Sequence, residues 1–346
     1  MSLTMSQTPS LNARDRMARR RPAWVVWGVL FYTLLVILFG AVVRVTGSGA
    51  GCGQHWPTCN GEIVHLPRKL ETLIEFSHRL TSGLSLVLVV LMVWWVRRRV
   101  PRQHLARKTS WLSLLFLVFE ALLGAGLVLF ELVAHNASLA RAIVMPLHLT
   151  NTSLLMLCLT LTAWAVPKQD LSFAFGGPRS WLLLLGLAAL LLVSATGAVT
   201  ALGDTLYPVS AAGHWSLGVE QAGGAVTAIE RMRSLHPLLA LFVALYLFVV
   251  ASYQTKPKHL SGWLVPSVIG ALLLQLMLGV INIWLSAPGY MQILHLGMAN
   301  AVWVLWVLLC AESLRSPASD RASERPAQPA SSRIPSPGAT TRSSGA

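Results

Sequence analysis

The chain has 346 residues, of which 54% are hydrophobic and only 12% are charged. Soluble domains carry about 25% charged residues, so this composition favours an integral membrane protein. Lysine and arginine number 27 against 13 aspartate and glutamate, which gives a net charge of +14. Because the basic residues cluster between long apolar runs, as in cytoplasmic loops of membrane proteins, the charge does not indicate nucleic-acid binding.

Eight apolar stretches follow one another, each long enough to cross a hydrocarbon layer of about 30 Å as a helix. We expect spans at approximately 24–43, 73–96, 109–131, 144–166, 180–201, 233–252, 261–285 and 290–312. The first stretch has no cleavage site of a secretory signal, so we expect it to be retained as a helix. Residues 1–22 are polar and basic, and residues 313–346 are rich in Pro, Ser, Ala and Arg, so we expect both to be disordered.

Basic residues predict which side of the membrane each loop faces. They gather before the first span and after spans two, four and six, most densely at Arg97, Arg98, Arg99, Arg102, Arg107 and Lys108. The positive-inside rule therefore places both termini in the cytoplasm and loops 44–72 and 202–230 outside. The short N-terminus and compact loops favour a bacterial plasma membrane, with the mitochondrial inner membrane as the alternative.

Two pairs of motifs indicate an internal repeat. Gly40-Ala-Val-Val at the end of span one resembles Gly197-Ala-Val-Thr at the end of span five. Glu120-Ala-Leu-Leu-Gly124 in span three resembles Gln275-Leu-Met-Leu-Gly279 in span seven. We therefore expect an all-α protein built from two similar four-helix bundles, residues 23–166 and 180–312.

Four of the ten histidines fall inside predicted spans, one in each even-numbered span and near its outer end. They are His78, His148, His236 and His295, whereas His55, His65, His104, His135, His214 and His259 lie in loops. Ionisable residues inside a span are costly and indicate function, and two facing imidazoles can ligate a heme iron. The alternative for each histidine is a hydrogen bond to a neighbouring helix. A zinc site is a weaker alternative, since no cysteine lies near these histidines in sequence.

The first half carries further candidate residues. Glu75 lies three residues before His78 and shares its helix face, so it could move a proton or stabilise positive charge; otherwise it favours the helix start through the dipole. Arg44 and Arg79 could bind heme propionates or extend to lipid headgroups. Cys52 and Cys59 flank a short segment of an outer loop and could form a disulfide staple or a redox pair.

The two halves are not equivalent. Where the first half has Glu75 before its histidine, the second half has Arg233, and it has no counterpart of the two cysteines. This asymmetry predicts a substrate half followed by a cofactor half.

At these residues the chain resembles the heme A synthase family. The resemblance rests on Gly40-Ala-Val-Val-Arg44-Val-Thr-Gly-Ser-Gly49, on Cys52 through Trp56-Pro57 to Cys59, and on Glu75-Phe-Ser-His78-Arg79. It extends over roughly residues 24–312. It implies oxidation of a porphyrin methyl group of heme O to the formyl group of heme A, which supplies a terminal cytochrome oxidase.

The resemblance also implies roles for individual residues. His78 and His148 would hold heme O, with Arg44 and Arg79 nearby, and Glu75 would be the acid–base or charge-stabilising group. A heme b cofactor would have His236 and His295 as axial ligands. Cys52 and Cys59 would form a disulfide, and a heme O synthase and an unidentified electron-transfer protein would be partners.

Two residues depart from the family pattern. Glu120 stands in span three where the family more usually has glutamine, and Pro237 follows the third histidine.

A diheme electron-transfer cytochrome b is the main alternative function, and a transporter with intramembrane histidines is the other. Glu75 and the cysteine pair favour the enzyme, because electron transfer alone needs neither.

Overall fold

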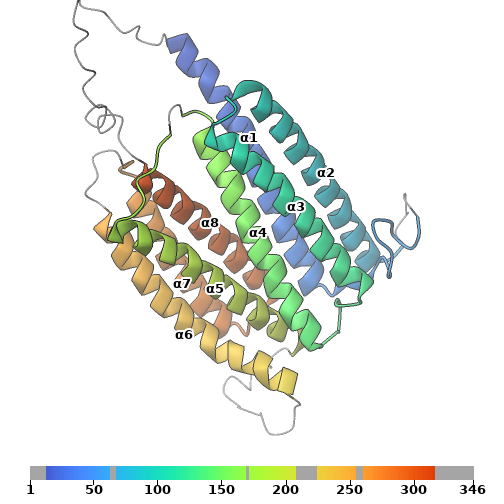
Figure 1. Ribbon diagram of the computed structural model, residues 1–346. Helices are drawn as coiled ribbons and strands as arrows, with labels where there is room; N and C mark the ends of the chain where they lie inside the picture. The colour runs from blue at the N-terminus through green and yellow to red at the C-terminus, as the bar shows by residue number, and fades with distance from the viewer. Residues whose placement is uncertain (1–12, 63–67, 169–170, 208–223, 255–259, 316–346) are drawn as a thin grey trace, which may run out of the picture. The chain divides into compact units, whose positions relative to one another are not determined.

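Eight long helices make up most of the described chain in the computed structural model (Figure 1). The structure describes residues 13–62, 68–168, 171–207, 224–254 and 260–315, with the side chains of 13–22 and 224–230 left out. The helices are α1 (Ala13–Val45), α2 (Leu70–Arg99), α3 (Leu105–Leu129), α4 (Leu139–Ala165), α5 (Pro178–Leu206), α6 (Gly224–Tyr253), α7 (Leu264–Trp284) and α8 (Gly289–Leu314).

All eight helices contain a stretch long and apolar enough to cross a membrane, as the sequence predicted. Two of them, α1 and α6, extend beyond the apolar stretch itself. In particular, α1 begins at Ala13, inside the segment expected to be disordered, because Ala, Met and Arg favour helix and continue the span into water. Residues 1–12 and 316–346 lie outside the described residues, and so do the internal ranges 63–67, 208–223 and 255–259, which contain His65, His214 and His259.

The helices contact one another in two rings of four. In the first half, α1 packs against α2 and α4, and α3 packs against the same two helices. In the second half, α5 packs against α6 and α8, and α7 packs against the same two. The halves meet where α4 contacts α5 and α8, and where α1 contacts α8 (Figure 1). Both halves therefore have the same order of neighbours, which is the pattern expected of a repeat.

Tryptophans of α8 fill the junction between the halves. The indole N–H of Trp303 donates to the carbonyl oxygen of Ser153 in α4, at 2.8 Å. Trp306 is fully buried against α5, where a Cβ atom at Gly186 would lie only 2.4 Å from the indole ring. Glycine is needed at that position because any side chain would displace the tryptophan.

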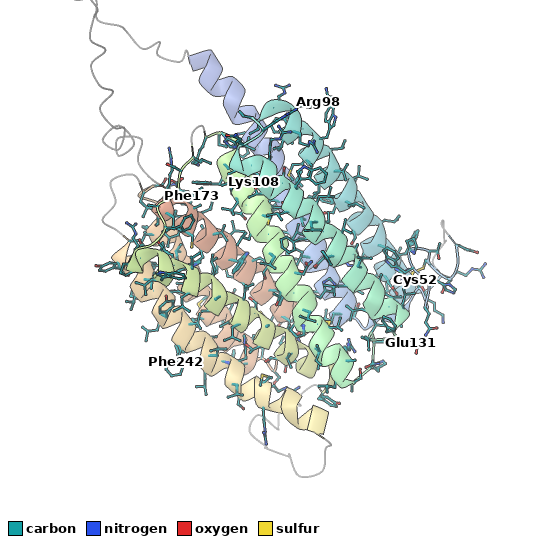
Figure 2. All side chains as sticks on the ribbon, in the orientation of Figure 1. Cys52, Arg98, Lys108, Glu131, Phe173 and Phe242 are labelled. Atoms are coloured by element: carbon teal, nitrogen blue, oxygen red, sulfur yellow. A yellow bond between two sulfur atoms is a disulfide. The ribbon has the colours of Figure 1, made fainter. Side chains whose placement is uncertain are left out.

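The outward faces of the helices are apolar. On α6, Leu241, Phe242 and Leu245 are 54%, 68% and 60% exposed, and Figure 2 shows Phe242 on the outer surface of the bundle. Large contiguous apolar surfaces are rare on water-soluble monomers. The protein is therefore a multi-pass membrane protein whose outer surface is suited to lipid.

Candidate functional site

The four span histidines lie at one end of the bundle, which we call the histidine end. Helices α2, α4, α6 and α8 all start there, and each histidine is close to the start of its helix. Figure 2 labels Cys52 and Glu131 at this end, and Arg98 and Lys108 at the opposite end. We call the opposite end the basic end.

The histidines are brought together in two pairs. His78 of α2 lies within range of electrostatic interaction with His148 of α4. His236 of α6 lies within the same kind of range of His295 of α8. The sequence predicted these two pairs, and each pair spans a single half of the protein.

A glycine of the preceding helix faces each histidine ring. A Cβ atom would lie 3.3 Å from His78 if placed at Gly40, 3.9 Å from His148 at Gly124, 3.0 Å from His236 at Gly197 and 3.2 Å from His295 at Gly279. Three of these distances are shorter than ordinary contacts between carbon atoms, so a larger residue would push the ring away. The same glycines belong to the motifs that the sequence predicts to be repeated, so these motifs contain the residue that approaches each histidine ring.

The polar neighbours of the histidines differ. His236 Nδ1 lies 3.1 Å from the Thr196 hydroxyl, and His295 Nε2 lies 3.2 Å from the Gln275 amide nitrogen. His148 Nδ1 lies 2.9 Å from Glu120 Oε1, at ion-pair distance but without the alignment of a regular hydrogen bond. His78 Nδ1 and His295 Nδ1 are buried and have no hydrogen-bond partner among the described residues.

The loop between α1 and α2 folds back onto the start of α2. Cys52 and Cys59 are joined by a disulfide, and both cysteines are fully buried. A Cβ atom at Gly51 would lie 2.6 Å from the backbone of Glu71, so glycine permits this close approach. Thr72 of α2 donates a hydrogen bond of 2.8 Å to the carbonyl oxygen of Gly51.

Glu75 and Arg79 hold this loop in place. Glu75 is 3% exposed and accepts a hydrogen bond of 2.8 Å from the backbone N–H of Cys52. Arg79 forms an ion pair with Glu75 and donates to the carbonyl oxygens of His55 and Thr58. Glu75 therefore does more than favour the helix start, and Arg79 is directed to the loop instead of to lipid.

Arg44 joins the two halves. Its guanidinium donates to the carbonyl oxygen of Ala201 at 2.7 Å, to the Thr205 hydroxyl, and to Gln292 Oε1 at 2.9 Å. It also lies within electrostatic range of Asp204. Aligning Gly40 with Gly197 also aligns Arg44 with Ala201, so Arg44 contacts the residue at its own matching position in the second half.

In the second half, an ion pair joins the end of α5 to α6. Arg233 of α6 pairs with Asp204 of α5 at 2.9 Å and donates to the carbonyl oxygen of Gly203 at 2.8 Å. Pro237, which departs from the family pattern, lies inside α6 without interrupting the helix. A membrane helix can accommodate proline in this way.

The basic end has a hollow of about 420 Å³, and it is separate from the histidines. It is lined by Arg97, Arg102, Arg107, Lys108 and Trp111. His78 and Arg97 lie near opposite ends of α2, about 28 Å apart at 1.5 Å per residue. This hollow therefore does not belong to the candidate site.

Sequence reasoning missed several residues around the histidines. It noted the four glycines as repeat markers without assigning them a contact. It did not single out Thr196 beside His236, Asn151 whose amide donates to Glu120, or Gln292 which accepts from Arg44. A glycine that recurs at a fixed distance from an intramembrane histidine on the next helix is the signal that could have identified the first group. The other three act through side-chain orientation, which the sequence does not specify.

Relatives of this chain carry names from heme biosynthesis. A protoheme IX farnesyltransferase from Thermus thermophilus is 46% identical over 308 residues, which cover 85% of this chain and 50% of the relative. A heme A synthase from Shouchella clausii is 47% identical over 97 residues, covering 28% of this chain and 32% of the relative. A heme A synthase from Bacillus licheniformis is 37% identical over 146 residues, covering 41% and 45%. The chain spans half the length, or less, of these curated relatives.

A family model covers most of the bundle. The model described as COX15-CtaA, cytochrome oxidase assembly protein, matches residues 23–307, from the first span into α8. The match includes both histidine pairs, the disulfide loop and all four glycines that face the histidines. The chain therefore belongs to the COX15-CtaA family of cytochrome oxidase assembly proteins.

Proposed function

We propose that the protein is a heme A synthase, an oxidoreductase that converts a porphyrin methyl group of heme O to the formyl group of heme A. The observation that carries the proposal is the arrangement of the histidines in two pairs at one end of the membrane bundle. The family and the heme A synthases among the relatives support the same reaction. The product would be used to assemble cytochrome oxidase.

The residues present fit a heme in each half. Histidine is a common heme ligand, and cofactor sites in helix bundles are built from side chains on facing helices, so each histidine pair could hold a heme that would supply a redox-active iron. Buried ring nitrogens without a partner, at His78 and His295, are expected where a ligand completes the site. Within the described residues, no three His, Cys, Asp or Glu side chains come together as a bare metal ion would require. This favours ligand pairs over a four-ligand zinc site.

In this proposal the two halves have different roles. His78 and His148 hold the substrate heme O, and His236 and His295 hold a heme b that relays electrons; each heme supplies a redox-active iron when bound. Glu75 is the acid–base or charge-stabilising group in the first half. Because Glu75 and Arg79 also hold the disulfide loop, this loop is positioned beside the substrate site. Arg44 lies at the junction and interacts with the second half.

We propose that a heme O synthase and an electron-transfer protein are partners of this chain in the membrane. Half of the Thermus thermophilus relative lies outside the match, and we propose that the farnesyl transfer in its name belongs to that unmatched half. A separate heme O synthase would then act next to this chain and supply its substrate, and an electron-transfer protein would be the second partner. The bacterial relatives favour a bacterial plasma membrane. Both termini lie on the cytoplasmic side in this proposal, because the basic residues gather in the loops of that side.

The extracted hemes test this proposal. The full chain is produced with and without a heme O synthase, purified in detergent, and its hemes are identified by mass. We expect heme b in both preparations, and heme O and heme A only with the synthase. The variant His78→Ala/His148→Ala serves as the control, since it should retain heme b and yield no heme A.

A diheme electron-transfer cytochrome b is the second candidate. The observation that favours it is that Glu75 is engaged by Cys52 and Arg79, so a structural role alone would account for this buried carboxylate. Heme b alone, in both preparations, would support the cytochrome. A preparation with no Soret absorption would contradict both candidates and favour a transporter.

A further inference from the structure

Of the four span histidines, only His148 has a carboxylate beside its ring among the described residues. His236 faces a threonine hydroxyl, His295 faces a glutamine amide, and His78 Nδ1 has no hydrogen-bond partner in the described part of the chain. The repeat places Glu120 and Gln275 at matching positions of α3 and α7. The two halves therefore differ in charge at the same place, next to one histidine of each pair.

The surroundings of Glu120 suit an ionised carboxylate. Asn151 Nδ2 donates to Glu120 Oε2 at 2.6 Å, and the Thr152 hydroxyl donates to Glu120 Oε1. With His148 Nδ1 at 2.9 Å, each of these three polar neighbours of Glu120 is a group that can donate. A deprotonated carboxylate only accepts, so it matches this set of neighbours. Asn151 also donates to the carbonyl oxygen of Phe116, which fixes the amide between the two helices.

The contact of Glu120 leaves the other ring nitrogen of His148 available. Glu120 lies at Nδ1, whereas Nε2 is directed toward Gly124, where a Cβ atom would be 3.9 Å away. An imidazole that donates its Nδ1 proton can ligate iron only through Nε2. The carboxylate at 2.9 Å from Nδ1, although not aligned as a regular hydrogen bond, favours the tautomer with its proton on Nδ1 and leaves Nε2 as the ligating atom.

We propose that Glu120 is a positioning residue that orients His148 and increases its electron donation to the heme iron of the first half. The inference rests on the proposed function, because it requires heme in that half. A carboxylate that accepts the outer N–H of a metal-bound histidine makes the ring a stronger donor and favours the oxidised metal. Because Glu120 carries a negative charge, the first-half heme has a lower midpoint potential than it would have with an amide at position 120. Gln275, at the matching position of the second half, is such an uncharged amide.

A purely structural role for Glu120 makes a different prediction. If Glu120 only joins α3 to α4 through Asn151 and Thr152, its replacement lowers stability and leaves the potential of bound heme unchanged. Since the potential separates the two roles, it is the readout of choice.

The experiment exchanges the two side chains in the full-length protein. Glu120→Gln and Gln275→Glu are purified with their hemes, and the midpoint potential of each heme is measured by spectroelectrochemical titration, with electron paramagnetic resonance reporting the axial ligands. We expect Glu120→Gln to raise the first-half midpoint potential by at least about 59 mV. For a one-electron couple this is a tenfold change in the ratio of oxidised to reduced heme at a fixed potential. Gln275→Glu should lower the second-half potential, and each variant should leave the other heme unchanged.

Glu131→Gln is the matched control. Glu131 lies at the same end of the bundle, just beyond α3, with an exposed side chain, so its replacement removes an equal charge away from the histidine. Potentials unchanged in both exchange variants, or a shift in Glu131→Gln as large as in Glu120→Gln, would overturn the inference. If Glu120→Gln loses its heme, Gln275→Glu decides alone. A wild-type protein without any heme would instead contradict the proposed function.

Discussion

The two halves of the protein place their histidines alike and surround them differently. In both, a histidine pair lies at the same end of a four-helix ring, and each histidine ring approaches a glycine of the neighbouring helix. The first half adds Glu120, Glu75 and a disulfide loop, whereas the second half adds the Arg233–Asp204 ion pair. The halves therefore share their backbone packing and differ in the charges placed around it.

Removing one histidine of the second-half pair should have the largest effect. His236→Ala or His295→Ala should eliminate the heme of the second half and retain heme O in the first, since each pair lies within one ring of helices. Heme content per protein, with the extracted hemes identified by mass, measures this. Equal loss of both hemes in either variant would show that the halves do not bind heme independently.

Replacing Glu75 tests whether this carboxylate of the first half takes part in the reaction. Glu75→Ala should lower heme A formation by about 10²–10⁴-fold, the usual contribution of a positioned acid or base, while heme stays bound. Glu75→Gln is the control for structure, because its amide oxygen can still accept from the N–H of Cys52. If Glu75→Gln restores normal turnover, the residue holds the loop and does not take part in the reaction.

The glycines that face the histidines test the packing that both halves share. In Gly197→Ala the new Cβ atom would lie 3.0 Å from His236, and overpacking of this kind costs about 1–3 kcal/mol. We expect second-half heme affinity to fall about tenfold. Gly124→Ala is the matched control, since its Cβ atom would be at an ordinary 3.9 Å from His148. Equal heme affinity in the two variants would mean that these contacts do not position the rings.

The junction between the halves should give the smallest effect. Arg44→Met removes three hydrogen bonds from a guanidinium to the second half, and we expect thermal unfolding a few degrees lower while both hemes remain bound. Arg68→Met is the control, because Arg68 has an exposed side chain outside the helices. Loss of first-half heme in Arg44→Met would instead support the propionate contact that the sequence predicted.

Much of the fold and of the candidate site could be predicted from residue types. Eight apolar stretches specify eight spanning helices, because a backbone in lipid must satisfy its hydrogen bonds within the helix. The positions of His78, His148, His236 and His295 follow from the same stretches. The extent of α1 toward Ala13 could not be predicted, since that part of the helix is not apolar.

The roles of the charged side chains were less predictable. We expected Arg44 and Arg79 to contact propionates or lipid, and the structure connects Arg44 to the second half and Arg79 to the disulfide loop. Both contacts join residues from different helices or from a helix and a loop. A long flexible side chain can reach many partners, and the sequence does not specify which carbonyl oxygens lie within its range.

Residue types alone predict eight helices in the described chain that are long and apolar enough to cross a membrane, with one histidine near the same end of each even-numbered helix. Length and apolarity fix these features locally, before any helix meets another. Only the tertiary structure decided that Glu120 lies beside His148 and Gln275 beside His295, and that a glycine faces every ring. Those relations depend on the rotation and spacing of neighbouring helices, which packing in the folded bundle determines.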